Sequence, residues 1–136
     1  MIRPIIHDPL FLAQKSAVAT EADRQVITDL LDTLHASLDR CVGMAANMVG
    51  ERKRIIVFCN GPMQMVMVNP EMIAKSGEYE AEEGCLSLAG LRKTKRYRKI
   101  TVKYQDQTLR QLTGTFEGFT AQIIQHEIDH CNGILI

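Results

Sequence analysis

The sequence predicts one α+β domain, in which a mostly antiparallel β-sheet packs around a C-terminal helix and an amphipathic helix lies near the N-terminus. Two observations lead to this fold class. The periodic segments run in the order helix, several strands, helix, and no repeat or linker divides the 136 residues. The apolar fraction of 46% and the charged fraction of 24% are ordinary for a globular domain. We therefore expect residues 1–136 to form a single domain.

The first regular element is expected to be a helix over residues 21–38, after an irregular lead-in. Thr20 is a suitable N-cap, and Asp23 follows three positions later, as in a capping box. Apolar side chains recur at helical spacing: Val26, Ile27, Leu30, Leu31, Leu34 and Leu38. Charged residues, including Asp29, are expected on the opposite, polar face.

Strands are expected through the middle of the chain, followed by a last helix over residues 119–131. Short apolar and β-branched runs predict the strands: residues 54–59, 63–68, 71–77, 100–104 and 108–116. Asn60-Gly61-Pro62 forms a turn signal between the first two strands, and Asn69-Pro70 is expected to end the second. Asn132-Gly133 is a C-terminal cap signal for the helix.

The charge balance argues against some classes of partner. Lys and Arg together number 16 and Asp and Glu also number 16, so the net charge is zero. A neutral chain has no overall attraction to DNA or an anionic membrane, and no segment approaches the roughly 20 apolar residues of a membrane span. Because no signal peptide is evident, we expect a cytoplasmic location. In that reducing compartment the four cysteines are expected to be thiols rather than two disulfides.

Two charged runs lie close together in the sequence. Residues 92–99 are mostly Lys and Arg, and residues 78–83 are mostly Glu. A basic run can contact RNA. In a chain of zero net charge we interpret it instead as a solvated strand edge that the glutamates balance.

The last predicted helix contains the pattern His126-Glu127-Ile128-Asp129-His130. Residues four apart share a helix face, so both imidazoles can reach one metal ion. Glu127 stands beside the first ligand, where its carboxylate can act as a general base toward water at the metal. The alternative is a helix whose two histidines align by chance. We favour the metal site because this segment holds two of the chain's four histidines.

A catalytic metal site needs a third protein ligand and an open position. The candidates are His7, His35, the cysteines and the acidic residues. Cys85 is favoured because it follows a glycine in a loop, and a thiol near a metal ion binds as thiolate. An ordinary buried thiol is the alternative. The small residues of segment 39–50 either let a backbone approach this site closely or form a packed connection.

Three segments resemble the motifs of the peptide deformylase family, and they occur in the family's order. They are Gly43–Gly50, Glu83–Ser87 and Gln125–His130, of which the second and third match residue for residue. The resemblance covers almost the whole chain. It implies hydrolysis of the formyl group from N-formylmethionine at the start of newly made bacterial proteins, with release of formate.

The resemblance also implies roles for individual residues. Cys85, His126 and His130 would bind one divalent metal ion, typically Fe²⁺, with Zn²⁺, Ni²⁺ or Co²⁺ as substitutes. Glu127 would be the general base, and the backbone N–H of Leu86 would help to hold the oxyanion. Six further residues would bind the formyl-methionyl peptide: Val42, Gly43, Gly84, Arg92, Phe119 and Ile123.

The family's first motif carries a glutamine where this chain has Met48. In the family that amide donates a hydrogen bond to the oxyanion, which a thioether cannot do. Loss of one oxyanion donor typically lowers the rate by about 10²–10³. Asn47 also carries an amide and would compensate if the loop were shifted. Because many members carry a further C-terminal helix that this chain lacks, ribosome association is not inferred.

Two other functions stay open. The His-Glu-x-x-His pattern by itself indicates only hydrolysis at a metal, so another small N-acyl compound is an alternative substrate for an amidohydrolase. A weakly active or non-catalytic metal-binding protein is the other alternative. Met48 favours it, whereas the intact Glu127 argues against it, because a purely structural site needs no base.

Overall fold

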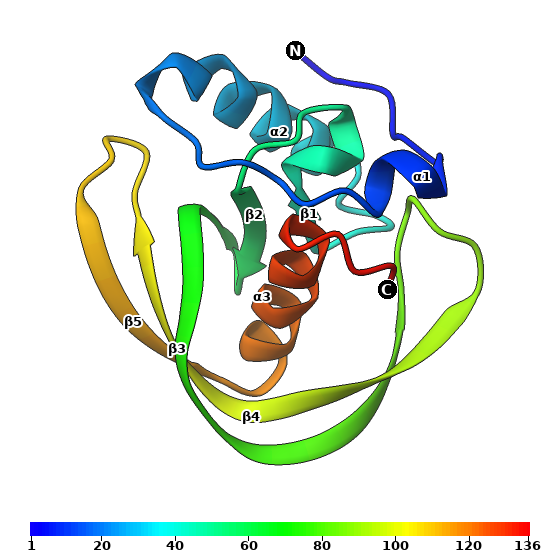
Figure 1. Ribbon diagram of the computed structural model, residues 1–136, viewed down its shortest axis with the longest axis vertical. Coiled ribbons are helices and arrows are strands. Elements are labelled where there is room, and N and C mark those ends of the chain that lie inside the picture. The colour runs from blue at the N-terminus through cyan, green and yellow to red at the C-terminus, as the bar shows by residue number, and fades with distance from the viewer.

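The computed structural model describes residues 1–136 as a curved antiparallel sheet that wraps around one helix (Figure 1). Five strands pair in sequence order: β1 (Gly43–Ala45), β2 (Ile55–Asn60), β3 (Met63–Gly84), β4 (Leu91–Gln105) and β5 (Gln111–Glu117). The helix α3 (Gly118–Cys131) lies in the hollow of the sheet. The α+β class with a C-terminal helix inside an antiparallel sheet is confirmed.

Two helices precede the sheet. α1 (Pro9–Leu12) is a single turn capped by Asp8, within the segment expected to be irregular. The 3-10 turn η1 (Glu21–Asp23) leads into α2 (Arg24–Ala36), and the predicted capping box forms at the start of that turn. A second 3-10 turn, η2 (Ala46–Val49), follows β1.

Asp29 on α2 does not face solvent, contrary to the expectation for that position. It is buried, with 2% of its surface exposed. The N-terminal segment crosses this side of α2, and Arg3 donates a hydrogen bond to Asp29 at 3.0 Å. Gln25, one turn earlier, donates to the other carboxylate oxygen at 2.8 Å. Because both oxygens have partners, the buried charge is tolerated.

The strand β3 continues through Asn69-Pro70, so the prediction that this pair ends a strand is wrong. The register of β3 against β4 shifts between Val68 and Glu71, and Asn69 has a φ of 51°. This β-bulge places Pro70, which has no N–H to donate, where the ladder is already interrupted. The predicted strand over residues 71–77 is therefore part of β3.

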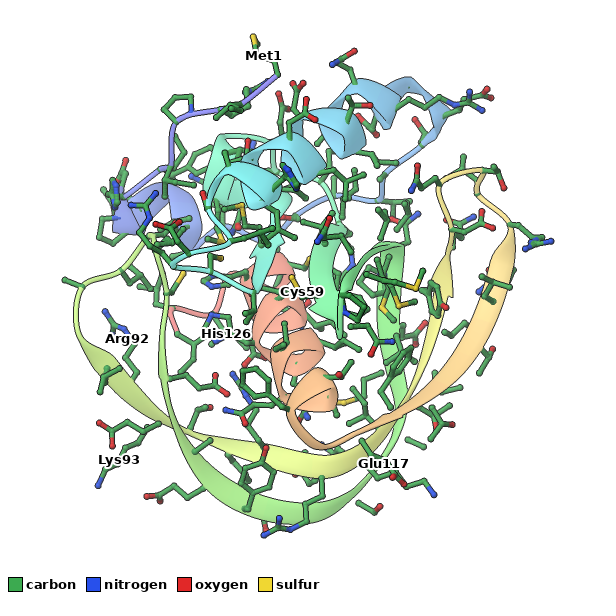
Figure 2. All side chains as sticks on the ribbon, turned by 180° about the vertical axis from the view of Figure 1, so that it is seen from behind. Met1, Cys59, Arg92, Lys93, Glu117 and His126 are labelled. Atoms are coloured by element: carbon green, nitrogen blue, oxygen red, sulfur yellow. The ribbon has the colours of Figure 1, made fainter.

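The two charged runs lie opposite each other on β3 and β4. Glu80 pairs with Lys95 and Glu82 with Lys93 in the strand register, and Arg92 and Lys93 lie on this hairpin (Figure 2). The glutamates therefore balance the basic run, as we expected of a solvated strand edge. The exceptions are Arg96 and Glu83, which are buried.

Apolar side chains pack on both faces of the sheet. Along β2, Ile55 and Val57 face the cluster that contains α2, and Ile56 and Phe58 face the cluster that contains α3. This alternation follows from the period of two in a strand. The four cysteines are free thiols, as expected. None of the helices has the length and apolar character that a membrane crossing requires.

Candidate metal centre and pocket

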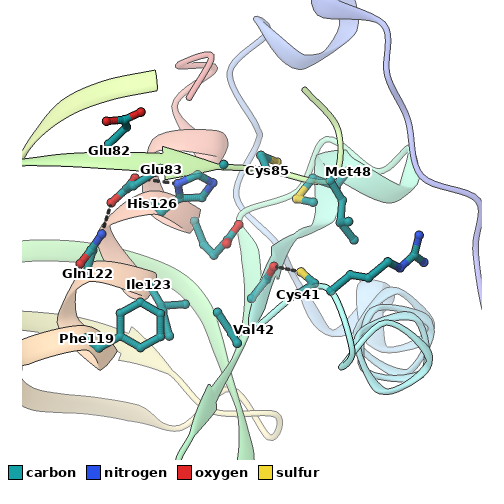
Figure 3. A pocket seen from close by; sticks show the side chains of 15 residues that line it. Cys41, Val42, Met48, Glu82, Glu83, Cys85, Phe119, Gln122, Ile123 and His126 are labelled. Atoms are coloured by element: carbon teal, nitrogen blue, oxygen red, sulfur yellow. Dashed lines mark hydrogen bonds and ion pairs between the residues drawn. The ribbon is translucent and has the colours of Figure 1, made fainter. Parts of the chain in front are cut away.

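A pocket of about 450 Å³ lies between α3, the end of β3 and the segment that leads into β1 (Figure 3). Most of the predicted site residues line it: Val42, Gly43, Met48, Gly84, Cys85, Leu86, Phe119, Ile123, His126 and Glu127. Arg92, predicted to bind substrate, is not among the lining residues. It is exposed near the start of β4 and lies opposite Glu83 in the strand register.

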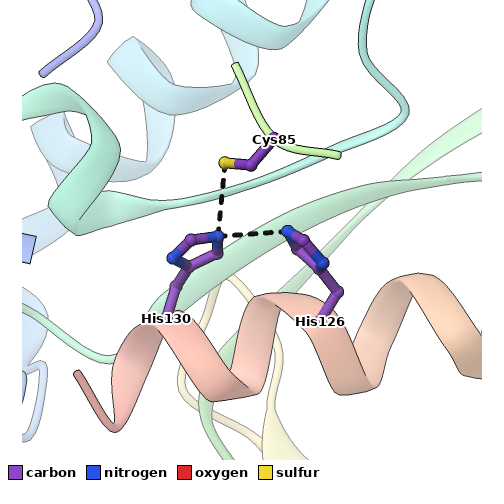
Figure 4. Close-up of side chains that lie close together, drawn as sticks. All are labelled: Cys85, His126 and His130. Atoms are coloured by element: carbon purple, nitrogen blue, oxygen red, sulfur yellow. Dashed lines mark hydrogen bonds between the residues drawn. The ribbon is translucent and has the colours of Figure 1, made fainter. Parts of the chain in front are cut away.

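Three side chains of the ligand type meet beside this pocket (Figure 4). His130 Nε2 lies 3.4 Å from Cys85 Sγ and 3.1 Å from His126 Nε2, and the three ligand atoms all lie within 4.8 Å of one another. The two histidines come from successive turns of α3, and the cysteine follows β3. Of the other candidate third ligands, His7 contacts the carbonyl of Ser87 at 3.0 Å, and His35 is exposed on α2.

The electrostatics of the two imidazoles fit a cation between them. Burial opposes a charge on His126, but Glu127, Cys85 and Glu83 raise its pKa to about 10. Burial lowers the pKa of His130 to about 3. The two Nε2 atoms lie 3.1 Å apart, so one proton at most lies between them. A divalent metal ion would replace this proton, and two imidazoles with a thiolate are donors that such ions accept.

Glu83 determines the orientation of the His126 ring. One oxygen of Glu83 accepts a hydrogen bond from His126 Nδ1 at 2.8 Å, which leaves Nε2 facing the other two ligands. Burial would raise the pKa of Glu83, but hydrogen bonds from His126 and Arg96 outweigh it and lower the pKa to about 2. A carboxylate behind a metal-binding histidine holds the ring in the orientation that the metal needs.

The positive charge of Arg96 stabilises the buried carboxylate of Glu83. It binds Glu83 through two nitrogens, at 2.9 and 2.7 Å, and Asp129 through a third contact at 2.8 Å. Only 3% of its surface is exposed.

We expect Arg96→Met to lower the free energy of unfolding by about 3–5 kcal/mol, because Glu83 would stay buried without its counter-charge. Urea denaturation measures the loss. The control is Lys95→Met, one residue earlier, where an exposed ammonium pairs with Glu78 and solvent screens the contact. Equal stabilities of the two variants would contradict this assignment.

Glu127 lies in the pocket wall with a carboxylate oxygen that has no partner. It is 4% exposed, and its Oε1 accepts no hydrogen bond. Burial raises the pKa of Glu127 to about 7, against the opposing effect of His126. A carboxylate that titrates near neutral pH is able both to accept and to return a proton.

The whole chain matches known proteins of one kind. A model of the polypeptide deformylase family matches residues 3–136. The chain belongs to the polypeptide deformylase family. Members of this family are metal-dependent hydrolases that remove the N-formyl group from newly made proteins. A peptide deformylase from Clostridium beijerinckii is 56% identical over 136 residues, which is 100% of both chains.

Solved peptide deformylases share the fold. One from Legionella pneumophila has a TM-score of 0.88 and 37% identity, and the match covers 99% of this chain and 83% of that one. A class I type b peptide deformylase from Acinetobacter baumannii, bound to Met-Ala-Ser, has a TM-score of 0.88 and 29% identity, over 99% and 96% of the two chains.

Met48 is the position at which this chain departs from the family's first motif, which carries a glutamine there. Its side chain is 1% exposed and lines the same pocket as Cys85 (Figure 3). The backbone N–H of Ala45 donates to its sulfur at 3.5 Å. The interpretation that Asn47 compensates is wrong, because its amide nitrogen donates to the carbonyl of His130 at 3.0 Å and it does not line the pocket.

Five further residues line the pocket that were not among the predicted catalytic, metal-binding or substrate-binding residues: Arg40, Cys41, Glu82, Glu83 and Gln122. Gln122 precedes His126 by four residues, so helical spacing alone places it on the same face. Arg40 and Cys41 precede β1 in segment 39–50, for which an approach to the site was one of the two expectations. Burial raises the pKa of Cys41 to about 12, and its thiol donates to the Gly43 carbonyl at 2.8 Å.

Proposed function

We propose that residues 1–136 act as one catalytic domain that hydrolyses the formyl group of N-formylmethionine at the N-termini of nascent chains, and that Glu127 is its general base. The observation that carries this assignment is the buried Glu127 carboxylate oxygen, which has no partner and lies in the pocket wall beside the ligand-type side chains. The Met-Ala-Ser bound by the Acinetobacter relative is a tripeptide that begins with methionine, which supports a substrate of this class. We place the protein in the cytoplasm, because nascent chains are made in that compartment.

The metal ligands in this proposal are Cys85, His126 and His130. Bound there, a divalent ion would polarise the formyl carbonyl and make water more acidic. Imidazole and thiolate ligands bind the divalent ions of iron, zinc, nickel and cobalt. We propose Fe²⁺ because the deformylase motifs are those of a family that typically uses it.

The protein's own groups complete the reaction. Glu127 takes a proton from the attacking water and passes it to the leaving amine as the formyl C–N bond breaks. The water oxygen forms the new bond to carbon, so formate and a free N-terminus are the products. The backbone N–H of Leu86 donates to the oxyanion as negative charge develops on it.

The peptide binds along β1 in this proposal. β1 is an edge strand whose only partner in the sheet is β2, so its other edge can accept an added strand at Gly43. The methionine side chain then enters the pocket next to Phe119 and Ile123, with Val42 and Gly84 as further walls.

Met48 favours one variant of this function, a deformylase of reduced rate. The thioether has no proton to donate to an oxyanion, and the nearby Asn47 amide is occupied elsewhere. The metal ligands and the base do not depend on this position.

The deciding experiment is formate release from formyl-Met-Ala-Ser by anaerobically purified protein loaded with iron or nickel. We expect turnover in the parent and none in Cys85→Ala, which should also fail to retain the metal. Acetyl-Met-Ala-Ser is the matched substrate control. Cleavage of the acetyl peptide without the formyl peptide would instead indicate an amidohydrolase of other N-acyl compounds, and metal retention by Cys85→Ala would refute the ligand set.

Gly43 provides a second test of the site. A Cβ at this position would lie 2.7 Å from Ile123 Cγ2 and 2.9 Å from Glu127 Oε2. Because the base must move to make room, we expect Gly43→Ala to lower kcat/KM by roughly 10²-fold and the free energy of unfolding by about 1–3 kcal/mol.

Formate release and urea denaturation measure these two losses. The control is Gly114→Ala on β5, where a Cβ would lie 3.0 Å from the ring of Phe116, away from the pocket. It should lose stability and keep its activity. Full activity in Gly43→Ala would exclude close contact between this position and the base.

A further inference from the structure

Gln122 on α3 connects Tyr79 on β3 to the carboxylate of Glu83, which orients the proposed metal ligand His126. Its amide nitrogen donates to Glu83 Oε2 at 2.9 Å, and its amide oxygen accepts from the hydroxyl of Tyr79 at 3.2 Å. Figure 3 shows Gln122 and His126 on either side of the Glu83 carboxylate, one bonded to each oxygen.

Glu83 has two separate sets of partners. Arg96 holds both of its oxygens from β4. Gln122 and His126 hold one oxygen each from α3, where they lie one turn apart on the same face. Arg96 neutralises the carboxylate, and it reaches α3 itself only through its contact with Asp129 at 2.8 Å. Gln122 and His126 are thus the side chains of α3 that bond directly to the two oxygens of this carboxylate.

We infer that Gln122 is a positioning residue for His126. By holding Glu83 Oε2 against α3, it keeps Glu83 Oε1 aligned with His126 Nδ1, and the ring then directs Nε2 at the other ligands. Tyr79 in turn holds the amide oxygen of Gln122, so the amide keeps its nitrogen toward Glu83. This inference rests on the metal site of the proposed function.

A second glutamine on α3, Gln125, attaches the β3–β4 hairpin to this helix without bonding to Glu83. Gln125 accepts from the backbone N–H of Tyr97 at 2.9 Å and donates to its carbonyl at 2.8 Å, so it anchors the same hairpin to the same helix. It does not line the pocket, and its hydrogen bonds go to Tyr97 and Ala121. Gln125 is therefore the matched control for loss of hairpin anchoring.

The test measures Co²⁺ affinity of the full chain by competition with a chelator, together with the visible spectrum of the Co²⁺ complex. Gln122→Met keeps the side-chain length and removes both hydrogen bonds. We expect its Kd for Co²⁺ to rise by about 10–100-fold, with a changed ligand-field spectrum. Tyr79→Phe keeps the amide without its anchor, and we expect a smaller rise in Kd.

Gln125→Met should lower the thermal midpoint while its Kd for Co²⁺ stays at the parent value. The inference is overturned if Gln122→Met and Tyr79→Phe bind Co²⁺ as tightly as the parent, or if Gln125→Met weakens binding as much as Gln122→Met. If Gln122→Met does not fold, Tyr79→Phe alone decides.

Failure of the proposed metal site gives a different result. In that case the parent would show no thiolate-to-cobalt absorption, and Cys85→Ala would bind Co²⁺ as the parent does. The Kd values of the Gln122 and Tyr79 variants test the positioning role only if Co²⁺ binding by the parent depends on Cys85.

Discussion

Glu127→Gln is expected to lower kcat for formate release by about 10²–10⁴-fold, the range that a positioned general base contributes. The amide has nearly the shape of the carboxylate and cannot accept the proton of the attacking water. Since Glu127 is not one of the proposed ligands, the metal content of the purified variant should equal that of the parent. Single-turnover formate release and metal analysis of the same sample measure both quantities.

The matched control is Glu117→Gln, at the N-terminal end of the same helix. Glu117 is exposed, lies 3.6 Å from the ammonium of Lys99, and is remote from His126 (Figure 2). Its substitution should leave kcat unchanged. Parent-like turnover by a metal-loaded Glu127→Gln would show that another group carries the proton.

Met48→Gln is expected to raise kcat/KM by about 10²–10³-fold, the effect of supplying one oxyanion donor. Met48 lines the pocket together with Cys85 and Leu86, and glutamine has a similar length. In the absence of substrate, the new amide is a buried polar group without a partner. We therefore expect the gain in rate to be accompanied by a loss of about 1–3 kcal/mol in the free energy of unfolding.

Met48→Leu separates the effect of the donor from the effect of repacking. Leucine conserves the volume approximately and also lacks a donor, so its kcat/KM should stay near that of the parent. A gain in the leucine variant would assign the effect to loop packing. No gain in the glutamine variant would mean that the Leu86 N–H and the metal suffice for the oxyanion.

Local sequence patterns anticipated the elements that carry the site. The separation of four residues between His126 and His130 predicted that both imidazoles would share a helix face. On α3 their Nε2 atoms lie 3.1 Å apart. The capping box of Thr20 and Asp23 also formed as predicted. Cys85 was favoured because it follows a glycine in a loop, with a buried thiol as the alternative, and the likeness to the deformylase motifs then implied that it is a ligand.

Three of the errors concern residues whose partners lie far away in the chain. Asp29 is buried because Arg3 reaches it, and Arg96 is buried because Glu83 and Asp129 meet it. The Asn47 amide is occupied by the carbonyl of His130. None of these contacts leaves a trace in the spacing of neighbouring residues.

The sequence by itself determined the two longer helices, most strands and the pair of histidines on one face, because backbone hydrogen bonding and side-chain periodicity depend on residues a few positions apart. Tertiary structure alone decided that β3 passes through Asn69-Pro70, that Arg92 stays outside the pocket, and that Gln122 and Arg96 meet at Glu83. The physical reason is that a charged or polar side chain is buried only where distant segments bring enough partners to replace its water.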